Sequence, residues 1–168
     1  EAMANDLGQA LGEADHFEHV LDITRRWAND HKFRIGIQVL RGITDGIAAG
    51  PALTAVAETV IRVLCPYVEE EFAIRHGRIE CSGMCAVAYG KLGGRELMHG
   101  SDLDLVFVYD HPESAKQSDG PKPLVPSVYF MRLAQRIISA ISAPTGEGKL
   151  YDIDLRLRPF GNKGPVAI

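Results

Sequence analysis

The hydrophobic pattern of this chain changes period once, about halfway along, and that change constrains the fold more than any other feature. Before it, apolar side chains recur at three- and four-residue steps and form one helical stripe: Leu53, Val56, Ala57, Val60, Ile61, Leu64, Val68 and Phe72. Gly50-Pro51 is a typical helix start, and His76-Gly77 is a typical helix end. The pattern therefore predicts a long helix, kinked or split at Pro66, whose ring removes one backbone donor.

Two further helical stretches are expected before this helix. One carries the large apolar side chains Phe17, Val20, Leu21 and Trp27, and the other lies near residues 33–39 with a less regular pattern. These segments predict a helical subdomain at residues 1–78, ahead of a second part at residues 79–168.

The second part is expected to contain strands. Short runs rich in β-branched residues lie at 85–89, 103–109 and 149–157. A segment rich in Pro, Ser, Asp and Gly at 111–126 predicts a loop, and the apolar spacing at 127–142 predicts a helix. The chain is therefore expected to be α+β, with a small mixed sheet and helices after the helical subdomain.

Composition and charge exclude several classes of protein. Hydrophobic residues make up 46% of the 168 residues, which is enough to form a core. The net charge of −4 argues against a broad basic face for nucleic acid.

No apolar run approaches the length of a membrane span, and Glu1-Ala2-Met3 lacks the layout of a signal peptide, so we expect a cytoplasmic protein without membrane contact. Its three cysteines cannot pair completely, which favours reduced thiols.

The two ends of the sequence predict a longer polypeptide. The chain does not begin with Met, and a new apolar segment starts at its last residues, 164–168. We therefore expect a fragment whose second part is truncated at the C-terminus.

Two aspartates at the start of the second strand are the first candidates for chemistry. Side chains in a strand alternate faces, so Asp102 and Asp104 point one way while Leu103 and Leu105 point into the core. Two neighbouring carboxylates repel each other unless a cation lies between them, and hard oxygen ligands suit Mg²⁺ or Mn²⁺. Asp-x-Asp alone is weak, because many such pairs are solvated loop residues or turn formers.

The third predicted strand strengthens this interpretation. Its apolar residues alternate with two carboxylates and two guanidinium groups: Asp152, Asp154, Arg156 and Arg158. One alternative is an edge strand with salt bridges to solvent. The other is a third carboxylate delivered to a metal site, with arginines facing phosphate groups. Three carboxylates near a glycine turn are the layout that two-metal phosphoryl transfer needs.

Three longer motifs make a resemblance specific. The segments Gly90–Glu96, Ser101–Leu105 and Asp152–Gly161 are together similar to those of the glutamine synthetase adenylyltransferase/adenylyl-removing family. The resemblance is best from about residue 85 to 165. It implies a polymerase-β-like nucleotidyltransferase fold for residues 79–168.

The resemblance also implies site residues. Asp102, Asp104 and Asp154 would bind Mg²⁺ or Mn²⁺, with Asp152 ranked below Asp154. The glycine turn that cradles the triphosphate of ATP matches Gly93 and Gly94. The secondary candidates for phosphate contact are Ser101, Lys91, Arg156 and Arg158.

The implied reaction is transfer of AMP from ATP to a tyrosine of glutamine synthetase. The family enzyme contains two such folds, and one of them removes AMP by phosphorolysis instead. The context Leu150–Asp154 and the helical segment Arg132–Arg136 resemble the adding half, whereas Phe160 resembles the removing half. The resemblance implies a PII signalling protein as regulator. A competing interpretation is a regulatory module that binds nucleotide or PII without chemistry.

Overall fold

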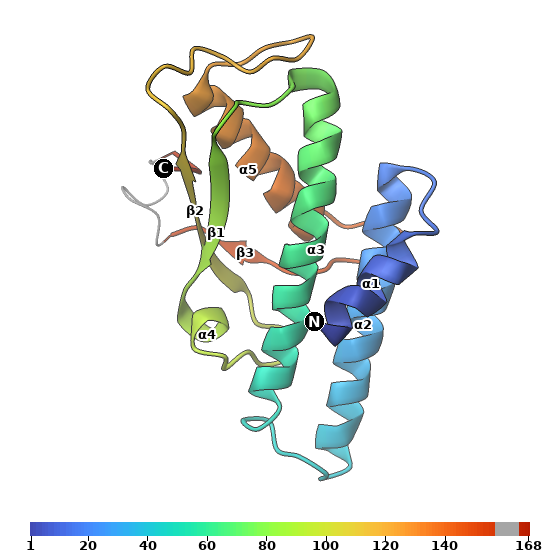
Figure 1. Ribbon diagram of the computed structural model, residues 1–168. Helices are drawn as coiled ribbons and strands as arrows, with labels where there is room; N and C mark the ends of the chain where they lie inside the picture. The colour runs from blue at the N-terminus through green and yellow to red at the C-terminus, as the bar shows by residue number, and fades with distance from the viewer. Residues whose placement is uncertain (157–164) are drawn as a thin grey trace.

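The structure, a computed structural model, describes residues 1–156 and 165–168. Three helices come first and are followed by a small sheet with two further helices (Figure 1). The elements are α1 (Ala2–Leu11), α2 (Phe17–Leu40), α3 (Gly50–His76), β1 (Gly83–Ala88), α4 (Gly90–Gly93), β2 (Leu103–Asp110), α5 (Pro126–Ser142) and β3 (Ile153–Asp154). This mixture confirms the α+β class, while the finer polymerase-β-like assignment and the boundary at residue 78 stay predictions.

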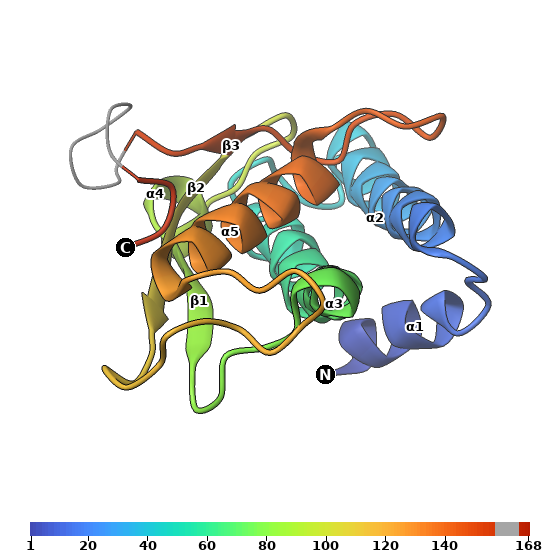
Figure 2. The ribbon, with the colours of Figure 1, turned by 90° about the horizontal axis from the view of Figure 1, so that it is seen from above.

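Helix α3 begins and ends where the sequence predicts. It carries Pro66 in its interior without being split there, because tertiary packing holds both halves of its apolar stripe in the core. The two stretches expected earlier are one continuous helix, α2, and α1 was not predicted. Figure 2 shows α3 between α1 and α2 on one side and α5 with the sheet on the other, and α3 contacts all three helices.

One sequence expectation about α3 is wrong. By length and composition alone, Gly50–His76 is apolar enough to cross a membrane, although no apolar run was expected to qualify. The residues that make it so apolar, among them Val56, Val60 and Leu64, are buried against neighbouring elements. A core helix packed on two sides needs apolar residues on both, which produces the same composition.

The sheet has the order β1-β2-β3. Strand β1 pairs antiparallel with β2, from Gly83 opposite Asp110 to Ala88 opposite Leu105. Strand β3 pairs parallel with β2 and is only two residues long, which corrects the longer strand predicted at 149–157. The backbone N–H of Arg156 turns back to Asp154 Oδ1 at 2.8 Å, and this local bond ends the strand.

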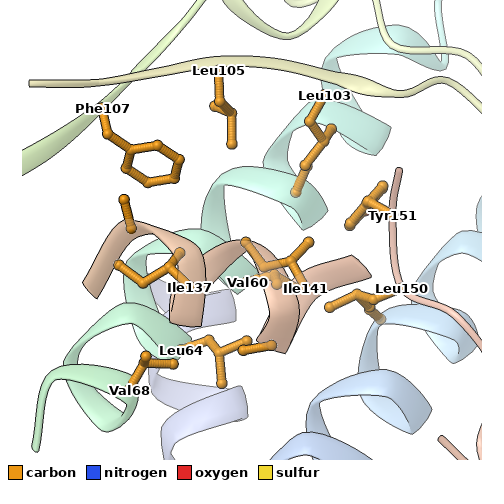
Figure 3. Close-up of a cluster of buried hydrophobic side chains, with 14 of the residues drawn as sticks. Val60, Leu64, Val68, Leu103, Leu105, Phe107, Ile137, Ile141, Leu150 and Tyr151 are labelled. Atoms are coloured by element: carbon orange, nitrogen blue, oxygen red, sulfur yellow. The ribbon is translucent and has the colours of Figure 1, made fainter. Parts of the chain in front are cut away.

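The buried face of β2 packs against two helices. Leu103, Leu105 and Phe107 are at most 1% exposed and face Ile137 and Ile141 of α5 (Figure 3). Helix α3 covers the same cluster, and Leu150 and Tyr151 close it next to β3. A single hydrophobic core therefore joins the helices to the strand that carries the candidate carboxylates.

A buried arginine connects α2 to the segment that leads into β3. Arg25 is completely buried, and its guanidinium donates to the carbonyl oxygens of Leu21 (3.0 Å), Ala140 (2.9 Å), Ala143 (2.5 Å) and Gly148 (3.1 Å). Burial lowers the pKa of Arg25, because the charged form loses contact with water. These bonds hold the end of α5 and the turn after it against α2, which places the chain ahead of β3.

All three cysteines are free thiols. Cys65 is half-buried in α3, whereas Cys81 and Cys85 are exposed. Burial raises the pKa of the Cys65 thiol to about 12, so this group stays protonated near neutral pH.

Candidate active site

The first two candidate carboxylates lie at the start of β2. Asp102 directly precedes the strand and is exposed, and Asp104 is half-buried within it. Between and beyond them, Leu103 and Leu105 point into the core (Figure 3). The hydrophobic packing of these leucines therefore determines that both aspartates face away from the core, as the alternating sequence predicts.

A glycine that the sequence analysis left out shapes the surroundings of Asp104. Gly90 has φ +52°, and a Cβ at this position would overlap Asp104 Oδ2. The backbone N–H of Tyr89 donates to the Asp104 carbonyl oxygen at 2.9 Å. Only glycine allows the start of α4 to lie this close to the carboxylate. Its place as the first glycine after a strand was the sequence signal for this role.

Asp154 lies next to Asp104 on the neighbouring strand. The two residues are partners in the parallel pairing of β2 with β3, and Leu103 N–H donates to the Asp152 carbonyl oxygen at 2.8 Å. The Asp154 side chain is 11% exposed. Pairing between strands more than forty positions apart in the chain thus brings two of the three predicted carboxylates together.

The Arg156 guanidinium is the cation that accompanies these carboxylates. Its Nε donates to Asp154 Oδ2 at 2.7 Å, and its Nη2 lies 2.5 Å from the same oxygen. These hydrogen bonds hold the pKa of Asp154 below its usual range. Asp154, and then the charges of Asp102 and Asp104, raise the pKa of Arg156. A single guanidinium therefore lies in the field of all three carboxylates.

The donor set fits a hard divalent cation, although its arrangement is not that of an assembled site. Carboxylate oxygens are the ligands that Mg²⁺ and Mn²⁺ prefer, and the charges of all three carboxylates raise the pKa of Arg156. Within residues 1–156 and 165–168, no group of three or more His, Cys, Asp or Glu side chains is arranged to hold a metal ion. The ligand set Asp102, Asp104 and Asp154 therefore stays a prediction.

The predicted glycine turn forms the short helix α4. The backbone N–H of Gly93 donates to Tyr89 and that of Gly94 to Gly90, each at 2.9 Å, so both amides are used within the turn. A Cβ on Gly93 would lie 2.7 Å from the Ala88 carbonyl oxygen, which explains the glycine by packing against β1. The role of this turn in binding a triphosphate stays a prediction.

The secondary candidates are placed differently from one another. Ser101 Oγ accepts the backbone N–H of Met98 at 3.1 Å and so shapes the loop before Asp102. Lys91 is exposed on α4. Arg156 is exposed, and its guanidinium contacts Asp154. Arg158 lies outside the described residues.

An α+β chain with carboxylates on two neighbouring strands beside a glycine turn has the features of a phosphoryl- or nucleotidyl-transfer protein. The family described as glutamate-ammonia ligase adenylyltransferase matches residues 1–168. This chain belongs to that family.

Curated relatives agree with the family. The chain is similar to the bifunctional glutamine synthetase adenylyltransferase/adenylyl-removing enzyme of Brucella suis, at 52% identity over 94% of this chain. It is 47% identical to the protein of the same name from Rhizobium meliloti and 41% identical to that from Bradyrhizobium, each over 98% of this chain. The matched region is only 16–17% of the length of these relatives.

Proposed function

We propose that this chain carries the catalytic site of a metal-dependent nucleotidyltransferase that moves AMP from ATP to a tyrosine of glutamine synthetase. The observation that carries the proposal is the pairing of Asp104 with Asp154 on parallel strands, with Asp102 directly before the first of these strands. Family membership supports it, because the relatives are named as glutamine synthetase adenylyltransferases and adenylyl-removing enzymes.

The proposed mechanism assigns a task to each group. Asp102, Asp104 and Asp154 would hold Mg²⁺ or Mn²⁺. The tyrosine oxygen bonds to the α-phosphorus of ATP while the bond to the leaving pyrophosphate breaks, and Asp154 accepts the proton of the tyrosine hydroxyl. A bound divalent ion supplies positive charge for the triphosphate and lowers the pKa of the nucleophile. Arg156, whose guanidinium contacts Asp154, would offer its planar fork to phosphate oxygens of the nucleotide.

The phosphate chain would be held by the glycine turn and its neighbours. The α4 turn that contains Gly93 and Gly94 is proposed to hold the triphosphate along its backbone. Lys91 contributes charge from the exposed side of this turn, and Ser101 positions the loop ahead of Asp102. Arg158 is proposed to contact phosphate as well.

The direction of the reaction is proposed to be addition of AMP. The names of the relatives contain both activities, and removal would use inorganic phosphate as nucleophile at a similar three-carboxylate site. The sequence context Leu150–Asp154 supports addition. We further propose that a PII signalling protein regulates the complete enzyme.

Labelled ATP tests the proposal directly. The purified protein is incubated with glutamine synthetase, Mg²⁺ and ATP labelled at the α-phosphorus, and label on glutamine synthetase is counted. A parallel reaction contains adenylylated glutamine synthetase with inorganic phosphate and no ATP. Label transfer in the first reaction supports addition, and release of AMP as ADP in the second supports removal.

The absence of both reactions would leave the binding-module interpretation. That interpretation is distinguished by ATP affinity, measured with and without Mg²⁺. A Mg²⁺-dependent gain in affinity that Asp104→Asn abolishes supports the proposed site. The control is Asp110→Asn at the exposed end of the same strand, which should keep the gain.

A further inference from the structure

A pocket with both apolar and charged walls lies beside the candidate active site, between α2 and the segments that precede β2 and β3. Its volume is about 260 Å³, and its walls include Lys32 of α2, Ser101 before β2, and Lys149, Tyr151 and Asp152 before β3. None of the three predicted metal ligands lines it. The pocket is therefore separate from the carboxylate cluster, although Ser101 directly precedes Asp102 in the chain.

Lys32 supplies the net charge of this pocket. Its ammonium donates to the Leu150 carbonyl oxygen at 3.0 Å and lies 4.4 Å from the centre of the Tyr151 ring. Among the residues described, no carboxylate lies within ion-pair distance of it. Burial lowers the pKa of Lys32, because no neighbouring negative charge offsets the loss of water. A half-buried cation without a carboxylate partner favours an anion in the adjoining space.

The other charges in the wall cancel. Lys149 forms an ion pair with Asp152, so these two side chains contribute little net charge to the pocket. The positive charge of Lys32 thus remains unbalanced within the lining that the structure describes, in a chain whose net charge is −4.

Two hydroxyl groups add hydrogen-bonding capacity. Tyr151 is only 9% exposed and lines the pocket, while its hydroxyl oxygen is buried from solvent and lacks a hydrogen-bond partner in the described part of the chain. A buried hydroxyl left without a partner is costly, so a shift of the Tyr151 side chain toward a ligand in the pocket would be compensated by a new hydrogen bond. Ser101 Oγ accepts a hydrogen bond from Met98 N–H, which leaves its own proton available to donate.

The size of the pocket limits what it can hold. Drug-sized ligands occupy cavities of roughly 300–1,000 Å³, and a water molecule takes about 30 Å³ of liquid volume. A pocket of about 260 Å³ suits a small anion with a few waters better than a whole nucleotide. An ammonium and two hydroxyl donors match the several acceptor oxygens of a phosphate group.

We propose that this pocket binds a phosphate-class oxyanion, held by Lys32 with the hydroxyls of Tyr151 and Ser101. Bound there, the anion contacts both the loop before Asp102 and the segment before Asp154, so it joins α2 to the two chain segments that carry the carboxylates. The site goes beyond the proposed function and does not depend on it, because the binding requires neither divalent metal nor AMP transfer.

Inorganic phosphate titrated into the purified protein in the presence of EDTA tests the site. Calorimetry is expected to show one binding event that Lys32→Met weakens at least about tenfold, since a charge-assisted hydrogen bond is lost. Lys116→Met removes a charge from an exposed loop position and should leave the affinity unchanged. Thermal melts without phosphate confirm that each variant is folded.

Tyr151→Phe provides a second, independent variant. Removal of the unpartnered hydroxyl should raise the melting temperature of the ligand-free protein while weakening phosphate binding severalfold. A merely structural hydroxyl would not produce this opposite pair of changes. Equal phosphate affinity in the wild-type, Lys32→Met and Tyr151→Phe proteins would overturn the proposal, as would the absence of phosphate binding to the wild type.

Two further titrations test where the anion binds and whether it is a free anion or the phosphate of a nucleotide. Asp104→Asn is expected to bind phosphate in EDTA as well as the wild type does, and loss of binding in this variant would assign the phosphate to the carboxylate site and overturn the proposal. Competition with AMP then separates two supporting outcomes. Displacement by AMP identifies the phosphate of a nucleotide as ligand, and unchanged binding identifies a free anion.

Discussion

The two faces of strand β2 are stabilised in opposite ways. On one face, Leu103, Leu105 and Phe107 are buried against α3 and α5. On the other, Asp102 and Asp104 face a neighbouring strand whose own carboxylate, Asp154, is partnered by a single guanidinium. Burial of apolar area on the first face lowers the free energy of the folded state, whereas the negative charges on the second face repel one another.

The difference indicates which face serves folding and which serves chemistry. Apolar packing at the buried face is strong enough to hold the strand in place despite the repulsion at the other face. The folding of the strand therefore does not depend on the charged face, and substitutions there should alter ligand binding or turnover more than stability. Each of the following predictions tests this separation.

Truncation of Phe107 should have the largest effect on stability. Phe107 is 1% exposed, so Phe107→Ala leaves a cavity and should lower the free energy of unfolding by about 3–5 kcal/mol. Val108, its neighbour in sequence, is 38% exposed on the opposite face, and Val108→Ala should cost less than about 1 kcal/mol. Urea denaturation measures both, and equal losses would contradict the assignment of the two faces.

Neutralisation of Asp104 should affect turnover rather than folding. Asp104→Asn removes a proposed metal ligand and should reduce AMP transfer at least about 100-fold. Its unfolding free energy should stay the same or rise slightly, because one repelling charge is gone. The assay is label transfer to glutamine synthetase, with Asp110→Asn as the control on the same strand. Full activity in Asp104→Asn would remove this residue from the mechanism.

Addition of a methyl group at Gly90 should moderately reduce both the stability of the protein and its AMP transfer. Gly90→Ala places a side chain at φ +52° against the Asp104 carboxylate, which should cost about 1–2 kcal/mol of stability. Displacement of that carboxylate should reduce AMP transfer by on the order of tenfold to 100-fold. Gly83→Ala is the matched control, because a Cβ at Gly83 meets no atom within 4 Å. If both alanine variants retain wild-type stability and activity, Gly90 has no special role.

Removal of Arg156 should have the smallest effect, and it concerns metal affinity. Arg156→Ala deletes the cation that competes for Asp154, so Mn²⁺ should bind about twofold to fivefold more tightly. Arg156→Lys keeps the charge and should stay closer to the wild type. Mn²⁺ titration followed by paramagnetic resonance gives both affinities without an activity assay. Weaker Mn²⁺ binding by Arg156→Ala would show that the guanidinium does not compete with the ion.

The sequence by itself determined the features that depend on near neighbours. The bounds of α3 follow from Gly50-Pro51 and His76-Gly77, and α5 starts one residue before the predicted position. The opposite directions of Leu103 and Asp104 follow from strand alternation. Helical and strand periods act over two to four residues, so a single sequence contains the information they need.

Only the tertiary structure decided which distant segments meet. Arg25 donates to carbonyl oxygens 115 to 123 positions away, and Asp154 pairs with Asp104 although β3 is just two residues long. The half-buried position of Lys32 was likewise invisible in the sequence pattern, and the sequence marked Gly90 only as a glycine after a strand, without its contact to the Asp104 carboxylate. Such contacts depend on how the core packs as a whole, because their energies are set by burial and by partners that local spacing does not specify.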